Sequence, residues 1–331
     1  MPRVAGVSVV LVALVCLPMF NPSAGSAQPP AAPPQRDQFA ADRFPPADPV
    51  PFDAKRAMGY LEALCKIGPR VSGSAGMKKQ QDLLVDHFKA LGGEVRWQRF
   101  SARQRSTRKQ VEMHNLIVSW KPNRPRRIIL CSHYDTRPIA DQEPDRRRWR
   151  EPFVSANDGG SGVALLMELA HHMRGLQTEV GVDFVFFDGE EFVDNPGRDE
   201  YFLGSKHFAK EYRKSPGKTR YLAAVLLDMV GGKDARFPIE QNSWWLAAPV
   251  VKSVWEAALE LRCNAFRADE FSRVPVEDDH VPLNRGGIPA IDIIDFDYRH
   301  WHRLSDVPEN CSGEGMEQVA RVLSVWLQRL K

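Results

Sequence analysis

The stretch FVFFDGEEF, residues 184–192, joins an apolar run to three carboxylates, Asp188, Glu190 and Glu191. Its four apolar residues, 184–187, predict a strand covered on both faces, as in parallel sheets flanked by helices. A carboxylate that is buried without a partner costs free energy. The two adjacent glutamates at the end of this strand therefore need a compensating group nearby.

Strand and helix patterns alternate from residue 52 onward. Strands are predicted at 94–100, 112–119, 127–133, 181–188, 222–229 and 290–296, and several contain apolar runs, namely 128–130, 184–187 and 223–227. Apolar residues at helical spacing run from Met77 to Leu91, and further helices are expected at 161–174, 205–213, 248–261 and 314–330. This alternation is typical of an α/β fold, a three-layer α/β/α sandwich with a mostly parallel central sheet. We expect residues 52–331 to form a single catalytic domain of this kind.

The first 51 residues differ from the rest in composition. Arg3 precedes the apolar run 4–20, and small residues then lead to a cleavage site after Ala27, so residues 1–27 are predicted to be a signal peptide. Residues 28–51 are rich in proline and predict an extended linker. We therefore expect an exported domain, secreted or periplasmic, without stable membrane insertion after cleavage. An uncleaved signal would instead tether the domain to a membrane.

Charge and cysteine content narrow the class of protein. The net charge of +3 is too small to favour nucleic acid as a partner, and the arginine clusters at 124–127 and 146–148 are typical of solvated loops. Four cysteines follow the predicted signal peptide: Cys65, Cys131, Cys263 and Cys311. Export permits disulfides between them, and buried free thiols fit their wide spacing equally well.

Polar residues cluster where several predicted strands end. In sheets of parallel strands, binding sites form beyond the carboxyl ends of the strands. Four predicted strands are followed by side chains that bind metals: His133 and Asp135, then Glu190 and Glu191, then Asp228, and finally His302. Asp158 precedes a predicted helix, where capping is an alternative role. Asp278 and Asp279 precede His280, and adjacent loop aspartates of this kind are usually solvated. The coincidence of four strand ends indicates one common site.

The spacing of these residues suggests separate roles. His133 and Asp135 are two residues apart on extended backbone and point to the same side, so Asp135 is expected to orient the His133 ring, either at a metal site or in a purely structural role. Gly189 allows both following glutamates to reach one pocket, where one binds a metal and the other carries a proton. Histidine and carboxylate ligands suit a catalytic zinc ion, with manganese or cobalt as alternatives. A metal ion would balance the charge at the end of the opening strand.

The motifs resemble those of the zinc aminopeptidase-like superfamily in sequence and order: CSHYDT at 131–136, NDGGSGVALLMELA at 157–170, FFDGEE at 186–191, LGSKHFA at 203–209, LLDMVG at 226–231 and WH at 301–302. Within that superfamily the chain is most similar to the glutaminyl-peptide cyclotransferases, or glutaminyl cyclases. Three stretches carry that similarity: DEYFLGSKHFAK at 199–210, EDDHVPLNRGGIPAIDII at 277–294 and RHWHRLSDVPENCS at 299–312. The resemblance covers roughly residues 55–330.

This resemblance implies an activity and a set of residue roles. N-terminal glutamine of peptides or proteins would cyclise to pyroglutamate with release of ammonia. One zinc ion would be held by three residues from distant parts of the chain: Asp158, Glu191 and His302. Glu190 would carry the proton, Asp228 and Asp278 would form an acidic network with it, and Trp301 would line the substrate pocket.

Two rival functions stay open at this point. His133 with Asp158 and Asp228 would complete a second zinc site in a dizinc aminopeptidase, which hydrolyses N-terminal residues from peptides. An exported binding domain that keeps only the fold is the other rival, although an intact ligand set argues against it. Animal cyclases also carry a tryptophan shortly after the glutamate pair, where this chain has FVDNPGRDEY; Trp244 or Trp245 is a candidate replacement.

Overall fold

The computed structural model describes Phe39 and residues 47–215, 217 and 219–330. The predicted signal peptide and most of the predicted linker lie outside these residues. Within that linker, neither Phe39 nor residues 47–51 belong to a helix or strand. The Val50 amide donates a hydrogen bond to Ser324 Oγ at 3.2 Å. No helix within the described ranges is both long and apolar enough to cross a membrane.

A six-stranded sheet forms the centre of the domain, in the order β1-β2-β4-β3-β5-β8. The strands are β1 (Glu94–Arg103), β2 (Gln110–Trp120), β3 (Arg126–His133), β4 (Gly181–Phe187), β5 (Arg220–Asp228) and β8 (Ala290–Ile294). β4, β3, β5 and β8 are parallel, while β2 is antiparallel to both β1 and β4. All six strands were predicted, with ends that differ by only a few residues.

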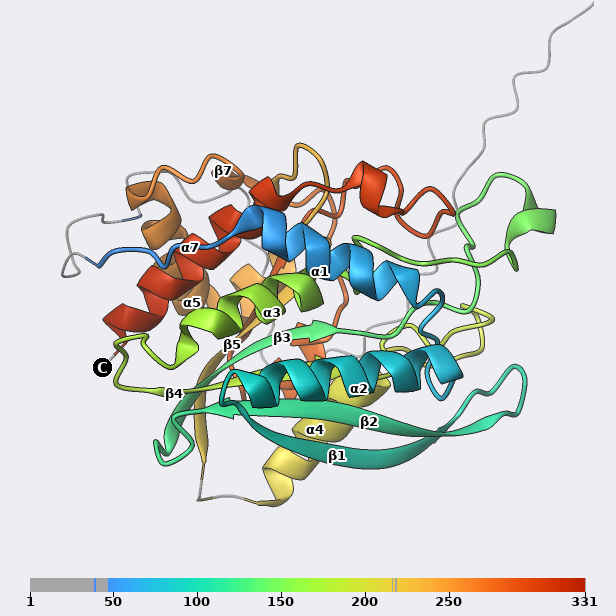
Figure 1. Ribbon diagram of the computed structural model, residues 1–331, viewed down its shortest axis with the longest axis horizontal. Helices are drawn as coiled ribbons and strands as arrows, with labels where there is room; N and C mark the ends of the chain where they lie inside the picture. The colour runs from blue at the N-terminus through green and yellow to red at the C-terminus, as the bar shows by residue number, and fades with distance from the viewer. Residues whose placement is uncertain (1–38, 40–46, 216, 218, 331) are drawn as a thin grey trace, which may run out of the picture. The chain divides into compact units, whose positions relative to one another are not determined.

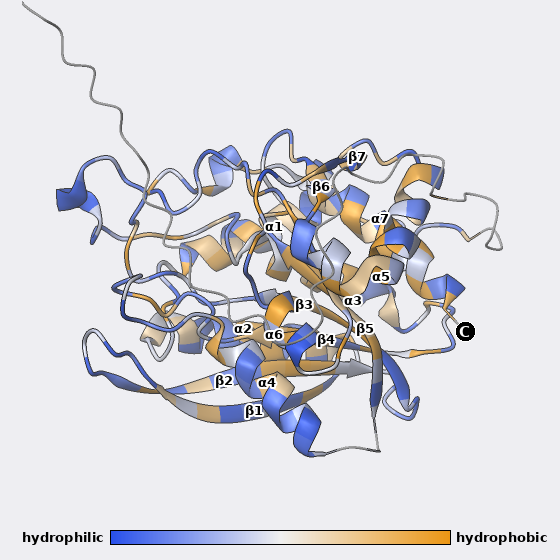
Figure 2. Ribbon diagram, turned by 180° about the vertical axis from the view of Figure 1, so that it is seen from behind, coloured by the Kyte–Doolittle hydropathy of each residue, from blue (hydrophilic) through white to orange (hydrophobic). Residues whose placement is uncertain are grey.

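Helices cover both faces of this sheet, which confirms the three-layer prediction. One face packs against α1 (Ala54–Lys66), α2 (Ala75–Ala90), α3 (Ser161–Met173), α5 (Gln241–Glu260) and α7 (Gly313–Arg329). The other face packs against α4 (Leu203–Lys214) and α6 (His280–Arg285), which lie in front of the strands in Figure 2. Alternate side chains of each strand point to opposite faces of the sheet and pack into two separate hydrophobic cores, Leu130 into one and Ile129 into the other. The central strands are therefore covered on both faces, as the opening stretch predicted.

Helix α1 and several short elements were not predicted. The short elements are α6, two turns of 3₁₀ helix at Arg146–Arg148 and Pro308–Asn310, and a two-stranded sheet of β6 (Phe237–Ile239) and β7 (Phe266–Phe271). Helix α5 begins seven residues before the predicted start at 248 and has a kink at Ala247, where φ is −146°. Pro249 explains the kink, because proline lacks an amide hydrogen and clashes with the preceding turn. The predicted start is therefore the start of the second part of the helix.

Candidate metal and catalytic site

The predicted site residues meet at the carboxyl edge of the sheet. His133 is the last residue of β3 and Asp228 is the last of β5, while Glu190 and Glu191 follow β4. Gly189 turns the chain after β4 with φ of +75°, and a Cβ there would lie 2.7 Å from Met113 Sδ. Only glycine combines that backbone angle with so close a neighbour. The turn delivers both glutamates to one buried place.

Asp158, Glu191 and His302 form one group of residues that could hold a metal ion. All three are buried, and one ligand atom from each lies within 4.8 Å of the others. His302 Nε2 is 2.5 Å from Glu191 Oε1 and 3.5 Å from Asp158 Oδ2. Asp158 Oδ2 and Glu191 Oε2 have no hydrogen-bond partner within the described part of the chain. Zinc binds such donors at about 2.0–2.2 Å, which places tetrahedral ligands about 3.5 Å apart, so these residues fit a zinc ion.

A second group adjoins the first and shares Asp158 with it. His133 Nε2 lies 3.0 Å from Asp158 Oδ1 and 3.2 Å from Asp228 Oδ1. These three residues also bring their ligand atoms within 4.8 Å of one another. The site therefore offers donors for one metal ion or for two.

Asp158 and Asp135 have contacts that differ from the simplest expectations. The N-cap residue of α3 is Gly160, and no side chain caps this helix, so capping does not explain Asp158. Asp135 Oδ1 lies 3.8 Å from His133 Nδ1, too far for the hydrogen bond that we expected. Its two oxygens accept instead from the backbone amides of Glu190 and Glu191, both at 3.1 Å. Asp135 thus fixes the loop that carries the glutamate pair.

Two residues beside the first metal group were missed from the sequence. Arg137, whose side chain is only 1% exposed, places its guanidinium 3.4 Å from Glu191 Oε1 and 2.9 Å from Asp141 Oδ2. Asp141 Oδ1 in turn lies 2.9 Å from His302 Nδ1. A carboxylate at the outer nitrogen of a metal-binding histidine orients the ring and makes it a better ligand. The available signal was the position of Arg137 directly after CSHYDT.

Asp306 is a third residue that was missed. It is fully buried and accepts from the backbone amides of Asn157 and Asp158, at 2.9 and 3.1 Å. Tyr298 Oη donates to the same carboxylate at 2.9 Å. Asp306 therefore holds the loop of Asp158 in the way that Asp135 holds the loop of the glutamates.

The two glutamates differ in their affinity for protons. Burial raises the pKa of Glu190 well above its usual value, and the neighbouring charge of Glu191 raises it further. Burial alone would also raise the pKa of Glu191, but the charges of His302 and Arg137 outweigh burial and lower it to about 2. Two carboxyls whose pKa values are driven apart are suited to different tasks. Glu191 is suited to ligate a metal as an anion, and Glu190 to hold and transfer a proton.

Further buried carboxyls extend the acidic region behind Glu190. Burial, with the charges of Asp228 and Asp279, raises the pKa of Asp278 well above its usual value. Asp279 accepts from Ser205 Oγ at 2.5 Å, and its backbone amide donates to Asp278 Oδ1 at 2.5 Å. Neither aspartate is the solvated loop residue that its position would ordinarily suggest. Asp292, on β8, was missed, although a carboxylate within the apolar strand AIDII was a visible signal.

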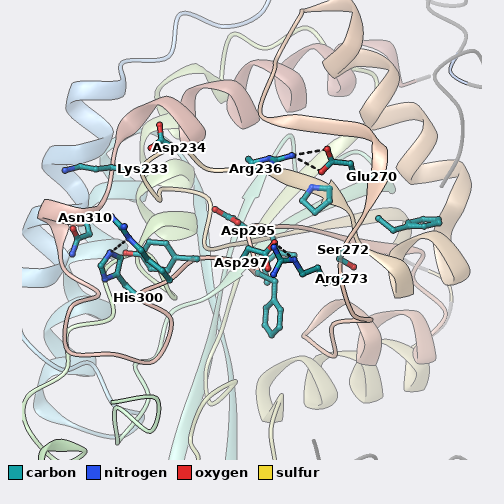
Figure 3. Close-up of a pocket in the computed structure, with 16 residues that line it drawn as sticks. Lys233, Asp234, Arg236, Glu270, Ser272, Arg273, Asp295, Asp297, His300 and Asn310 are labelled. Atoms are coloured by element: carbon teal, nitrogen blue, oxygen red, sulfur yellow. Dashed lines mark hydrogen bonds and ion pairs between the residues drawn. The ribbon is translucent and has the colours of Figure 1, made fainter. Parts of the chain in front are cut away.

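Trp301 forms part of an apolar wall next to the metal group. Its ring centroid lies 4.0 Å from that of His302 and 5.1 Å from that of Phe296. Phe296 also borders a cavity of about 530 Å³ whose charged side chains include Arg236, paired with Glu270 (Figure 3). Trp244, a candidate replacement wall, packs against Phe271 at 6.1 Å. Trp245 is 37% exposed. The replacement of the missing tryptophan stays a prediction.

The four described cysteines are all free, and Cys131, Cys263 and Cys311 are buried. This agrees with the expectation of buried thiols. It also means that the site is held together by hydrogen bonds, ion pairs and packing.

The fold and the paired donor groups define an α/β protein of the zinc exopeptidase type. The model of peptidase family M28 matches residues 115–327. The crystal structure of a glutaminyl cyclase from Fimbriiglobus ruber is 50% identical, covers 87% of this chain and 98% of that one, and aligns with a TM-score of 0.85. The chain belongs to peptidase family M28 and, within it, to the glutaminyl cyclases.

Two other similar proteins illustrate the range of this family. The structure of a leucine aminopeptidase precursor from Bacteroides thetaiotaomicron is 30% identical, covers 86% of this chain and 100% of that one, and has a TM-score of 0.79. A glutaminyl-peptide cyclotransferase from Boiga irregularis is 25% identical over 241 residues, which is 64% of this chain. The chain spans 64% of the length of that curated relative.

Proposed function

We propose that this protein is a zinc-dependent glutaminyl cyclase, which converts N-terminal glutamine of peptides and proteins to pyroglutamate and releases ammonia. The observation that carries the proposal is the pair of adjacent buried glutamates with opposite proton affinity, Glu190 and Glu191, beside a complete donor set. The 50% identity to a solved glutaminyl cyclase supports the choice of reaction.

The residues divide the work of this reaction. A zinc ion bound by Asp158, Glu191 and His302 would supply a Lewis acid for the γ-amide carbonyl of the glutamine. The α-amine, with an ordinary pKa of about 8, must be neutral before its nitrogen attacks the γ-carbonyl carbon. Glu190 takes a proton from the attacking nitrogen and returns it to the amide nitrogen as the carbon–nitrogen bond breaks and ammonia departs.

The remaining residues support the proton transfer and position the substrate. Asp228 and Asp278 lie close enough for their charges to act on each other, and they would share protons with Glu190. Trp301 would wall the pocket and keep water away from the reacting atoms. Because the attack is intramolecular, correct orientation of the bent side chain removes much of the barrier. His133 and Asp135 would hold the surrounding loops or, in the case of His133, a second metal ion.

The second candidate function is a dizinc aminopeptidase. The donor group of His133, Asp158 and Asp228 favours it, because a second metal ion there could activate water for hydrolysis. One assay separates the two reactions. The protein with zinc is offered a peptide that begins with glutamine, and the products are analysed for ammonia and a peptide lighter by one ammonia. Release of free glutamine would instead establish the peptidase.

The two glutamates provide a matched pair of variants for the proposed roles. Glu190→Gln should abolish turnover while the protein still binds one equivalent of zinc. Glu191→Gln should lose both turnover and tight zinc binding, because it removes a ligand. Activity in Glu190→Gln would exclude it as the proton carrier.

We also propose that residues 1–27 direct export and that the catalytic domain meets its peptide substrates outside the cytoplasm. The support is the charged, apolar and small-residue order of the N-terminal segment. Mass spectrometry of the N-terminal peptide of the exported protein should place its first residue at position 28, as glutamine or as pyroglutamate. An intact N-terminus in the membrane fraction would show a tether instead.

A further inference from the structure

Two adjoining hollows lie between α4 and α6, on the face of the sheet shown in front in Figure 2. The inner hollow has a volume of about 250 Å³ and the outer one about 520 Å³. Lys206, Pro282 and Arg285 line both of them, so the two hollows form one continuous depression. We refer to it as the α4–α6 groove.

The inner end of this groove adjoins the loop that carries the glutamate pair. Phe202, in its lining, donates its backbone amide to the carbonyl of Glu190 at 3.1 Å. Tyr201, also in the lining, accepts a hydrogen bond from Arg137 at 3.1 Å. Glu277, on the opposite side, directly precedes Asp278. A peptide whose first residue occupies the site can therefore enter the groove with the residues that follow.

The charge of the groove changes along its length. The inner hollow contains acidic and basic side chains that pair with one another, such as Arg105 with Glu200 at 3.0 Å. The outer hollow is lined by five cationic side chains and no carboxylate: Lys206, Lys210, Arg213, Lys214 and Arg285. Lys206, Lys214 and Arg285 pair with carboxylates outside this lining, at 2.9, 2.7 and 3.8 Å. Lys210 and Arg213 have no ion-pair partner in the part of the chain that the structure describes. For a chain with a net charge of only +3, this is a strong local excess of positive charge.

The cavity in Figure 3, which Phe296 borders, offers a contrast. There Arg236 is paired with Glu270 at 2.9 Å, and Arg273 with Asp297 at 3.2 Å. The lining of this cavity holds four carboxylates beside four cations, Lys233, Arg236, Arg273 and Arg299. The lining of the outer α4–α6 groove holds cations alone, and the partners of three of them lie outside that lining. A chain that leaves the site would gain from negative charge in only one of these two directions.

We infer that the α4–α6 groove binds the residues that follow the N-terminal glutamine and favours peptide substrates with acidic side chains at those positions. The inference rests on the proposed function. The paired inner section receives the first residues after the glutamine, and the outer section attracts carboxylates farther along the chain. An extended peptide advances by about 3.3 Å per residue, so a peptide of several residues is needed to reach the outer cations. Complementary charge of this kind acts on association and weakens as salt is added.

The test compares three substrates of the zinc-loaded protein: the dipeptide Gln-Gly, a Gln-initiated octapeptide with three glutamates in its second half, and the same octapeptide with three lysines. The ratio of kcat/KM for the acidic peptide to that for the basic one should be about tenfold or more at low salt, given about 0.5 kcal/mol for each exposed charge pair. The effect should appear in KM and shrink at 0.5 M salt.

Charge-reversal variants locate the effect. Lys210→Glu with Arg213→Glu should abolish or invert the preference for the acidic peptide. The matched control, Lys233→Glu with Arg273→Glu at the cavity of Figure 3, should retain it. Melting curves of both variants are the control that they are folded.

Each outcome bears on a separate claim. Failure to cyclise Gln-Gly would refute the proposed function, since the dipeptide does not depend on the outer hollow. Cyclisation of all three substrates with equal efficiency would refute the groove as an acidic-peptide site. A preference that persists in the α4 variant and disappears in the control would assign the peptide to the cavity of Figure 3 and overturn the inference.

Discussion

Replacement of Arg137 by methionine should destabilise the metal-free protein much more than the zinc-bound protein. Arg137 is a buried cation that lies 3.4 Å from Glu191 and 2.9 Å from Asp141. At an effective dielectric constant of about 20, each pair gains about 5 kcal/mol of Coulomb energy. Desolvation of the guanidinium offsets much of this gain, and removal of one partner of a buried pair costs about 3–5 kcal/mol.

The expected size of the effect depends on what remains to balance Glu191. In the metal-free protein only His302, 2.5 Å away, is left to balance Glu191. A chain of this length loses about 2 °C of Tm per kcal/mol, so Tm should fall by roughly 6–10 °C. With zinc bound, the ion would balance Glu191, and Asp141 would keep the contact of its carboxylate with His302 Nδ1 at 2.9 Å. We then expect about half of that loss. Zinc should therefore raise the Tm of Arg137→Met by more than it raises that of the wild-type protein.

The assay is thermal unfolding after chelation and again with excess zinc. Arg127→Met is the matched control, because Arg127 forms a buried ion pair with Asp183 at 2.6 Å and lies at the start of β3, at the opposite end of the strand from His133. This variant should lose the same Tm in both states. If Arg137→Met also loses equal Tm in both states, Arg137 does not act on a metal ligand and the reasoning is refuted.

Three further predictions concern pH, the turn at the site and the metal. Burial raises the pKa of Asp295 from 3.8 to about 6. Its ionisation therefore lowers the free energy of unfolding as the pH rises from about 4 to about 6. Asp295→Asn should gain up to about 3 kcal/mol of unfolding free energy at pH 7.5 and none at pH 3.5. Gly159 has φ of +70°, and a Cβ would lie 2.6 Å from His133 Cε1, so Gly159→Ala should cost at least about 1–2 kcal/mol in urea unfolding from the backbone alone; an unchanged unfolding midpoint would contradict this. Chelation should remove turnover and lower Tm, and zinc should restore both, whereas full activity in the chelated protein would argue against a catalytic metal ion.

The parts of the fold that could be predicted depend on local sequence. Apolar runs made the central strands such as β4 predictable, because these strands are buried on both faces and their hydrophobicity does not depend on their partners. The edge strand β1 instead alternates exposed and half-buried residues. The short elements carry too few residues for a period to show, as with the six residues of α6. Helix α5 was predicted only in part. Its internal proline, Pro249, made the second part of the kinked helix look like the start of a separate helix.

The candidate site divides in the same way between local and tertiary information. Metal-binding residues stood out because they ended apolar strands, and the resemblance supplied their roles. Arg137, Asp141 and Asp306 did not stand out, because what matters about them is which distant atoms they contact. Asp141 and His302 are 161 residues apart in the sequence, and no spacing rule predicts their contact. Asp135 was predicted to be a site residue, but its expected hydrogen bond to His133 was wrong. The spacing of the two residues on a strand did not show that the backbone amides of Glu190 and Glu191 would lie closer to the Asp135 carboxylate.

The acidic region behind Glu190 also affects how the activity should depend on pH. Burial raises the pKa of Asp292 well above its usual value, and the charges of Asp278 and Asp228 raise it further. His280, fully buried, lies 3.2 Å from Glu240 and 3.9 Å from Asp292, which connects this region to the start of α5. Groups that interact this strongly release protons as a set, so a measured pKa belongs to the set and not to one residue. A shifted pH–rate profile in any one carboxylate variant therefore does not identify that residue as the proton carrier, and the assignment of Glu190 has to come from loss of turnover with zinc still bound.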